Sequence, residues 1–171
     1  MTDWLTIISA HEAKLWRTAY RILNHRDDAL DCCQQAIVDA YEYSLTHGVD
    51  QWGAFLTSLT TRRAIDRLRQ RNRTRQVVSL SDAGEPASDS ECPAQQAEAS
   101  ELVDRVRAAL VDLPQKQAEV FWLSCVEHAS HDDIGQCLGI SANESRVLLH
   151  RARSRLDSIL NHQRSGARQK T

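Results

Sequence analysis

The first 77 residues contain three stretches in which apolar residues recur at helical spacing. The first covers residues 3–23, the second 27–45, and the third begins near Gln51. Asn24 lies in the break between the first two and is suited to cap the second, since its side-chain oxygen accepts a bond from a free backbone N–H. The pattern predicts three packed helices, whose buried side chains include Trp16, Tyr20, Leu30, Tyr41, Trp52 and Phe55.

Residues 130–155 have the pattern of two short helices joined by a tight turn. Each helix begins with a serine followed three residues later by an acid, as in a capping box: Ser130 with Asp133, and Ser141 with Glu144. Gly139 stands where a left-handed residue ends the first helix, and Gly135 leaves room for the helices to cross closely. This pattern is typical of a helix-turn-helix that reads DNA, and a plain αα-hairpin is the alternative.

The second helix of this stretch has an apolar face and a basic face. Its inner positions are Ser145, Leu149, Ala152 and Leu156. Four arginines follow Glu144, and no acid appears before Asp157. The residues predicted to contact DNA are Asn143, Arg146, Val147, His150 and Arg151. Val147 is apolar on a polar face, and the hypothesis is that it contacts a thymine methyl. The alternative is a single exposed apolar side chain, which is common.

Residues 78–98 separate the two helical regions and carry serine, alanine and acids with almost no large apolar side chain. Such a segment buries too little surface to order itself, so we expect a flexible linker and independently moving domains. Helical periodicity resumes at Leu102, and Pro114 is suited to the first position of another helix. The sequence thus predicts an all-α protein with a domain at 1–77, an acidic linker at 78–98, a second domain at 99–162 and a basic tail at 163–171, which is too short to form a further domain.

The charges are unevenly distributed along the chain, and this distribution says more about possible partners than the net charge of −2. Residues 62–75 carry a net +6, whereas residues 81–104 hold seven acids and no base. The basic segment favours a polyanionic partner. No apolar run is long enough to span a bilayer, and the N-terminus lacks the basic region of a signal peptide. Five cysteines without regular spacing fit reduced thiols, which indicates a cytoplasmic protein.

Four segments together resemble the extracytoplasmic-function group of bacterial RNA polymerase sigma factors. In chain order they are DALDCCQQAIVDAYE, AFLTSLTTRRAIDRLRQRNR, ALVDLPQKQAEVFWL and DDIGQCLGIS…HRARSRL. The resemblance covers residues 8–160 and implies a cytoplasmic initiation factor of two helical domains. It implies that domain 1–77 is like sigma region 2, which binds the β′ clamp of core RNA polymerase and the minus-ten promoter element. Domain 99–162 would be like region 4, which binds the minus-thirty-five element and the β flap.

Residue roles follow from the same resemblance. The positions that match the clamp-docking stretch are Asp28, Asp31, Gln34 and Gln35. The positions that match the basic end of the helix near the melted promoter DNA are Arg62, Arg63, Arg67, Arg69, Arg71 and Arg73. Phosphate contacts by such a run would supply affinity and salt dependence without sequence preference. Family members commonly have an anti-sigma protein as a further partner, and no membrane association is implied.

This chain departs from the family pattern at two places. Arg62 stands where many members carry asparagine. Ser145 occupies a position where valine is usual, which predicts weaker packing of the second helix. Both departures bear on which promoter sequence is recognised rather than on the kind of domain.

Four alternatives compete with these interpretations. Cys125, His128, His131 and Cys137 supply zinc-type ligands, but the cysteines fall on apolar helix stripes, so no metal or cofactor is expected. Trp52, Phe55 and Tyr41 are suited to stacking on unpaired bases, although their apolar positions favour core packing. An enzyme is not expected, since no phosphate loop or nucleophile elbow is present. The remaining alternative is a helix-turn-helix regulator that acts without the polymerase.

Overall fold

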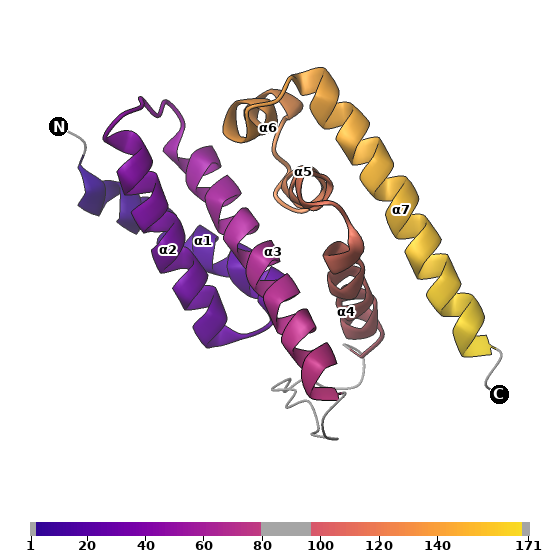
Figure 1. Ribbon diagram of the computed structural model, residues 1–171. Helices are drawn as coiled ribbons and strands as arrows, with labels where there is room; N and C mark the ends of the chain where they lie inside the picture. Colours follow the sequence, from indigo (N-terminus) through magenta and orange to yellow (C-terminus); the bar gives the residue numbers. More distant parts are fainter. Residues whose placement is uncertain (1–2, 80–96, 169–171) are drawn as a thin grey trace.

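The computed structural model describes residues 3–79 and 97–168, and these form seven helices without any strand. The N-terminal half consists of α1 (Trp4–Leu23), α2 (Arg26–Ser44) and α3 (Trp52–Ser79). The C-terminal half consists of α4 (Ala97–Asp112), α5 (Gln115–Cys125), α6 (His131–Leu138) and α7 (Ala142–Arg168) (Figure 1). The predicted all-α fold is confirmed. The predicted linker falls almost wholly on residues 80–96, outside the described residues, and α7 continues through Arg168 instead of ending near residue 162.

The break between α1 and α2 is built differently from the sequence prediction. Asn24 adopts a left-handed conformation with φ 46°, and its backbone N–H donates to the carbonyl of Tyr20. It therefore ends α1, and His25 caps α2 by accepting a hydrogen bond from the Asp28 N–H at Nδ1, 3.3 Å away. The predicted cap at Asn24 is wrong because asparagine, which tolerates the left-handed region, is needed to close α1.

Large apolar side chains of α1 and α3 fill the core of the N-terminal half. Leu15, Ile22, Leu56 and Ile65 are fully buried. α2 meets this core with small residues, namely Ala29, Cys32, Cys33, Ala36 and Ala40. These let α2 approach closely, and its larger residues Leu30 and Tyr41 are 41% and 48% exposed. Their predicted burial is wrong, because α2 is turned so that its alanine and cysteine side chains, and not Leu30 and Tyr41, face the bundle.

The C-terminal half packs α5, α6 and α7 around a core of its own. Val120, Leu123, Ile134 and Leu149 form that cluster. Pro114 precedes α5 as its cap with φ −56°, one residue earlier than predicted. The proline still begins the helix without loss, because an N–H at that place would have no helical partner.

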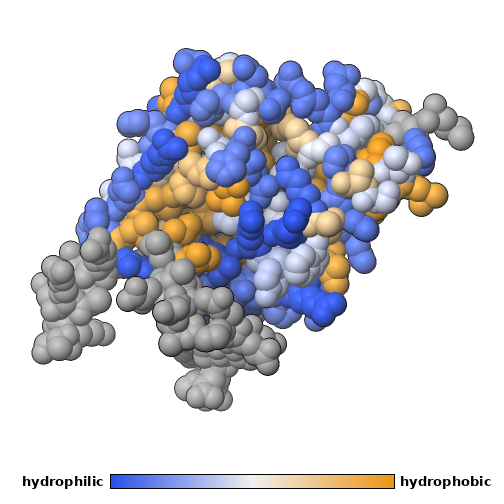
Figure 2. All heavy atoms as spheres, turned by 180° about the vertical axis from the view of Figure 1, so that it is seen from behind, coloured by the Kyte–Doolittle hydropathy of each residue, from blue (hydrophilic) through white to orange (hydrophobic). Residues whose placement is uncertain are grey.

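The two halves pack against each other, with α4, α5 and α6 contacting α3. In Figure 1, α4 and α5 lie between α3 and α7. One apolar cluster runs from Leu15 and Ile65 in the first half to Leu113 and Trp122 in the second. The view from behind shows a mixed surface, with hydrophobic residues gathered toward the side of the C-terminal half (Figure 2). This packed arrangement differs from the independent domains that the linker composition predicted. None of the helices within the described residues has the length and apolarity to cross a membrane.

Candidate nucleic-acid and protein interfaces

The predicted helix-turn-helix is present as α6 and the first half of α7. Ser130 caps α6 by accepting from the Asp133 N–H, and Gly139 ends it with φ 63°. Ser141 Oγ accepts from the Glu144 N–H at 3.0 Å and so caps α7. At Gly135 a Cβ would lie 2.6 Å from the carbonyl oxygen of Ile140, so only glycine lets the turn pass this close. Local sequence chemistry therefore defines both the helix starts and the turn between them.

The two faces of α7 are separated as the periodicity predicts. The inner residues Ser145, Leu149, Ala152 and Leu156 are all buried. The outer face is exposed along its whole length and consists of Asn143, Arg146, Val147, His150 and Arg151. Val147 is 41% exposed among these polar neighbours. The outer face thus offers two long cations, one imidazole, one amide and one apolar side chain to a partner.

Ser145 is held by a contact that the sequence did not reveal. It is fully buried, and its hydroxyl lies 2.9 Å from Nδ1 of His131, at the start of α6. The hydrogen bond joins the two helices of the motif where an apolar residue would otherwise pack. The expected weakness at Ser145 is therefore offset by polar pairing. A histidine 14 residues upstream is the only sequence signal, and nothing in the periodicity links the two.

The basic segment of α3 is largely engaged within the protein. Arg63 contacts Asp39 through Nε at 2.7 Å and Nη2 at 2.6 Å. Arg69 donates to the carbonyl of Leu113 at 2.6 Å. Among the described residues, Arg62 and Arg73 are exposed and make no ion pair or hydrogen bond. The six predicted DNA-contacting arginines of α3 therefore differ in how freely they can reach a phosphate.

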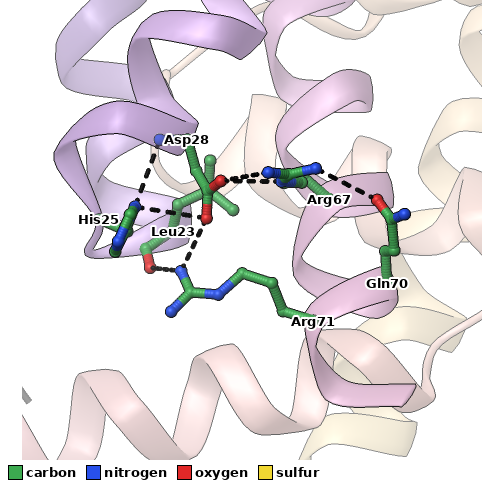
Figure 3. Close-up of polar contacts among 6 residues, drawn as sticks. All are labelled: Leu23, His25, Asp28, Arg67, Gln70 and Arg71. Atoms are coloured by element: carbon green, nitrogen blue, oxygen red, sulfur yellow. Dashed lines mark hydrogen bonds and ion pairs between the residues drawn. The ribbon is translucent and has the colours of Figure 1, made fainter. Parts of the chain in front are cut away.

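Asp28 organises the remaining two arginines (Figure 3). Asp28 is buried, and its side chain is 9% exposed. Its Oδ1 accepts from Arg67 at 2.6 and 2.9 Å, and its Oδ2 lies 3.2 Å from Arg71 Nη1. Arg71 also donates to the carbonyl of Leu23. Asp28 thus ties α2 to α3 through both of its carboxylate oxygens, and its part in polymerase docking stays a prediction.

The other predicted docking residues lie together on the exposed side of α2. Asp31, Gln34 and Gln35 are exposed, and Leu30 and Val38 are 41% and 47% exposed beside them. We refer to these five residues as the α2 face. The α2 face thus offers a protein partner both apolar contact and polar side chains for hydrogen bonds. Sequence periodicity missed Leu30 because it assigned that residue to the core.

Aromatic side chains cluster where α1, α2 and α3 begin or end. The Trp4 ring lies 4.8 Å from that of Trp52 and 5.4 Å from that of Tyr41, between centroids. Tyr43 and Phe55 are 4.9 Å apart. Trp52 and Phe55 thus pack among other rings, as the core alternative predicted, whereas Tyr41 keeps about half of its surface open.

The cysteines do not form a reactive or metal-binding centre in the described part of the chain. Burial raises the pKa of Cys32 to about 11 and that of Cys33 to about 12, which leaves both as thiols at neutral pH. No three His, Cys, Asp or Glu side chains of the described residues gather to hold a metal. Two of the four residues of the alternative zinc site have other partners: His131 pairs with Ser145, and Cys125 accepts from Arg153.

Each half of the chain matches a known protein family. Residues 7–74 match the family described as Sigma-70 region 2, and residues 104–156 match Sigma-70, region 4. The chain is 26% identical over 160 residues to the ECF RNA polymerase sigma factor SigE of Mycolicibacterium smegmatis, covering 94% of this chain and 62% of SigE. It is 23% identical to SigW of Bacillus subtilis, covering 88% and 84% of the two chains. The chain thus spans less than two thirds of the length of SigE.

Solved structures share the arrangement of helices. The sigma factor RpoE of Bartonella quintana, solved in complex with the anti-sigma factor NepR, has a TM-score of 0.52 and 22% identity, covering 92% of this chain and 93% of RpoE. SigJ of Mycobacterium tuberculosis has a TM-score of 0.52 and 19% identity, covering 89% and 52% of the two chains. These similarities support the all-α fold described above.

Proposed function

We propose that this chain, which belongs to the extracytoplasmic-function group of the sigma-70 family, directs bacterial core RNA polymerase to specific promoters for transcription initiation. The observation that carries the proposal is the co-occurrence of regions 2 and 4 in one chain, in family order, with a capped helix-turn-helix in the second. Residues 1–77 would act as the region 2-like domain and residues 99–162 as the region 4-like domain. The protein would work in the cytoplasm.

Three partners follow from this proposal. Core RNA polymerase would be bound at the β′ clamp by the N-terminal half and at the β flap by the C-terminal half. Promoter DNA would be bound at its minus-ten and minus-thirty-five elements. An anti-sigma protein is the third, by analogy with RpoE, which was solved with the anti-sigma factor NepR. The proposal assigns no enzymatic reaction to the chain.

The alternative is a regulator that uses its helix-turn-helix without polymerase. Run-off transcription with purified core enzyme and a library of promoter fragments distinguishes the two. A sigma factor forms a one-to-one complex with core enzyme and initiates transcripts at defined promoters, whereas a plain regulator does neither. In such a regulator the N-terminal half would sense a signal or dimerise; the match of that half to Sigma-70 region 2 favours the sigma factor.

We expect the double variant Asp31→Arg with Gln34→Arg to bind core polymerase roughly tenfold more weakly, because it places two cations in the centre of the α2 face. Both side chains are exposed, so the fold should be unchanged. Affinity is measured by fluorescence anisotropy of the labelled full chain. The matched control is Ser9→Arg with Glu12→Arg, which changes charge equally on exposed positions of α1. Equal affinity of the two double variants would remove the α2 face from clamp docking.

We expect Arg151→Ala and Val147→Ala to impair DNA binding in different ways. If Arg151 makes a bidentate base contact, its loss costs about 1–3 kcal/mol and changes preference at one base pair. If it binds a phosphate, all sequences weaken alike and the salt slope falls by about one. Val147→Ala should cost little on random DNA and lower discrimination at one A·T pair.

Selection from randomised promoters, carried out with both variants, measures these preferences. The matched control is Arg153→Ala, which removes the same charge from the other side of α7, where Arg153 contacts Cys125. Unchanged preference at every upstream position in both test variants would mean that the outer face does not read sequence.

A further inference from the structure

A cavity of about 610 Å³ lies between the end of α1, the start of α2, the second half of α3 and α4. Its volume is within the range of about 300–1,000 Å³ that is usual for small-molecule sites. One part of its lining is apolar and consists of Tyr20, Leu23, Leu68, Ala108 and Val111. The rest of the lining is polar or charged. The cavity is therefore suited to a ligand that has an apolar body and a charged end.

Arginine dominates the charged part of the lining. Four arginines from three helices line the cavity: Arg26 of α2, Arg71 and Arg75 of α3, and Arg107 of α4. Only two carboxylates line it, those of Asp27 and Asp104. Four guanidinium groups against two carboxylates leave a net charge of +2 around the cavity when His25 is neutral. The charged end of the ligand is therefore an anion.

Two of these guanidinium groups are held in place by acceptors of the protein itself. Arg71 Nη1 lies 3.2 Å from Asp28 Oδ2 and donates to the carbonyl of Leu23 at 3.3 Å. Arg107 Nε donates to the carbonyl of Arg21 at 2.9 Å, and its Nη1 donates to Asp104. No hydrogen bond from the described residues engages Nη2 of either arginine, and Figure 3 shows Nη2 of Arg71 pointing away from both of its acceptors. Both groups thus keep donors for a ligand, and their fixed positions lower the entropy lost on binding.

The first turn of α2 adds to the attraction for an anion. His25, which caps α2, lines the cavity together with the first two residues of the helix. The first N–H groups of a helix have no partner within it, and the positive end of the helix dipole attracts negative charge. Phosphate groups are commonly bound at such a place.

From this cavity we infer that the protein binds a nucleoside polyphosphate, with the phosphates on the arginines and the base against Tyr20 and its apolar neighbours. Guanidinium groups bind phosphate oxygens in pairs, and aromatic side chains stack on bases. The side-chain amides of Asn24 and Asn72 also line the cavity and can exchange hydrogen bonds with a base or a sugar. A cavity of this size holds one nucleotide rather than a length of DNA strand. The inference does not depend on the proposed function.

The test compares the double variant Arg26→Gln with Arg75→Gln to the wild-type full chain. Both side chains are exposed, so the fold should be unchanged. Isothermal titration calorimetry with ATP, GTP and sodium tripolyphosphate, at one ionic strength, measures binding. We expect the wild type to bind both nucleotides, and the double variant to bind them about tenfold more weakly or worse, because charge-assisted hydrogen bonds to phosphate are lost.

The matched control is Arg62→Gln with Arg73→Gln. It removes the same charge from exposed positions of α3 that do not line the cavity. Its nucleotide affinity should fall by less than about threefold, because salt screens charges at a distance. A second pair, Arg26→Lys with Arg75→Lys, keeps the charge but loses the planar fork, so it should recover only part of the affinity. Circular dichroism of all three pairs shows whether each is folded.

Each contrary result has a definite meaning. A wild-type chain that binds neither nucleotide at about 1 mM overturns the inference. Equal losses in the two glutamine pairs also overturn it, because only overall charge would then matter. Tripolyphosphate that binds as tightly as ATP and GTP overturns the place assigned to the base.

Competition with DNA completes the test. A single strand of about 20 nucleotides should lose less affinity than the nucleotides do in the Arg26 and Arg75 glutamine pair. If the strand displaces ATP and loses affinity by the same factor, the cavity is part of a DNA-binding surface and the small-molecule site is overturned. Polymerase binding enters none of these measurements, so their failure and the failure of the proposed function are distinguishable.

Discussion

Replacing Asp28 by alanine is expected to lower the free energy of unfolding by about 2–3 kcal/mol, the larger of the effects on the N-terminal half. The carboxylate accepts from Arg67, contacts Arg71 and is almost fully buried, so its loss leaves two guanidinium groups without their anion between α2 and α3. Breaking a buried pair by removing one partner typically costs about 3–5 kcal/mol. The expected value is smaller because the Arg67 side chain is 41% exposed and recovers part of its hydration.

Chemical denaturation of the full chain measures this effect, and Asp31→Ala is the matched control. Asp31 lies three residues further along the same helix but is exposed, so its loss should change stability by less than about 0.5 kcal/mol. A double-mutant cycle with Arg67→Ala isolates the pair itself. If Asp28→Ala is as stable as Asp31→Ala, then Asp28 does not position α2 against α3, and its surface role in docking would have to be reconsidered.

Gly135→Ala is expected to destabilise the C-terminal half by about 2–3 kcal/mol and to abolish specific promoter binding by that half. The added Cβ would meet the backbone oxygen of Ile140 at 2.6 Å, and a backbone atom in a tight turn cannot move aside without displacing α7. Helix propensity alone predicts the opposite sign, because alanine in the interior of a helix is favoured over glycine by about 1 kcal/mol. The result therefore separates close packing from intrinsic preference.

Gly53→Ala is the matched control for this substitution. Gly53 is also helical, but its Cβ would meet the ring of His11 at 3.0 Å, a side chain that can rotate away. We expect Gly53→Ala to be neutral or to stabilise the chain by up to about 1 kcal/mol, since helix preference is not opposed there by a backbone contact. Thermal unfolding and binding to a promoter fragment, measured on both variants, test the prediction. A Gly135→Ala chain that unfolds and binds like Gly53→Ala would show that the turn between α6 and α7 is less tightly packed than the structure indicates.

Local chemistry in the sequence determined the helices and the helix-turn-helix. The spacing of apolar residues predicts each helix, and Ser130, Ser141 and Gly139 mark helix ends because capping depends on only three or four neighbouring residues. The two faces of α7 follow from the same periodicity. Such features need no knowledge of what the helix packs against.

Tertiary structure alone decided which polar groups meet and which face of α2 is buried. Asp28 meets Arg67 across 39 residues, and Ser145 meets His131 across 14, at separations that no period relates. Leu30 is exposed because the small residues of α2, not its large ones, face the bundle. The close approach of the whole helix stabilises the fold more than the burial of one leucine would. The packing of the two halves is likewise a balance of terms that include a shared apolar cluster and hydrogen bonds between distant residues, such as the one from Thr18 to Glu127. Composition near the linker cannot report that balance, because its terms arise only when distant surfaces come together.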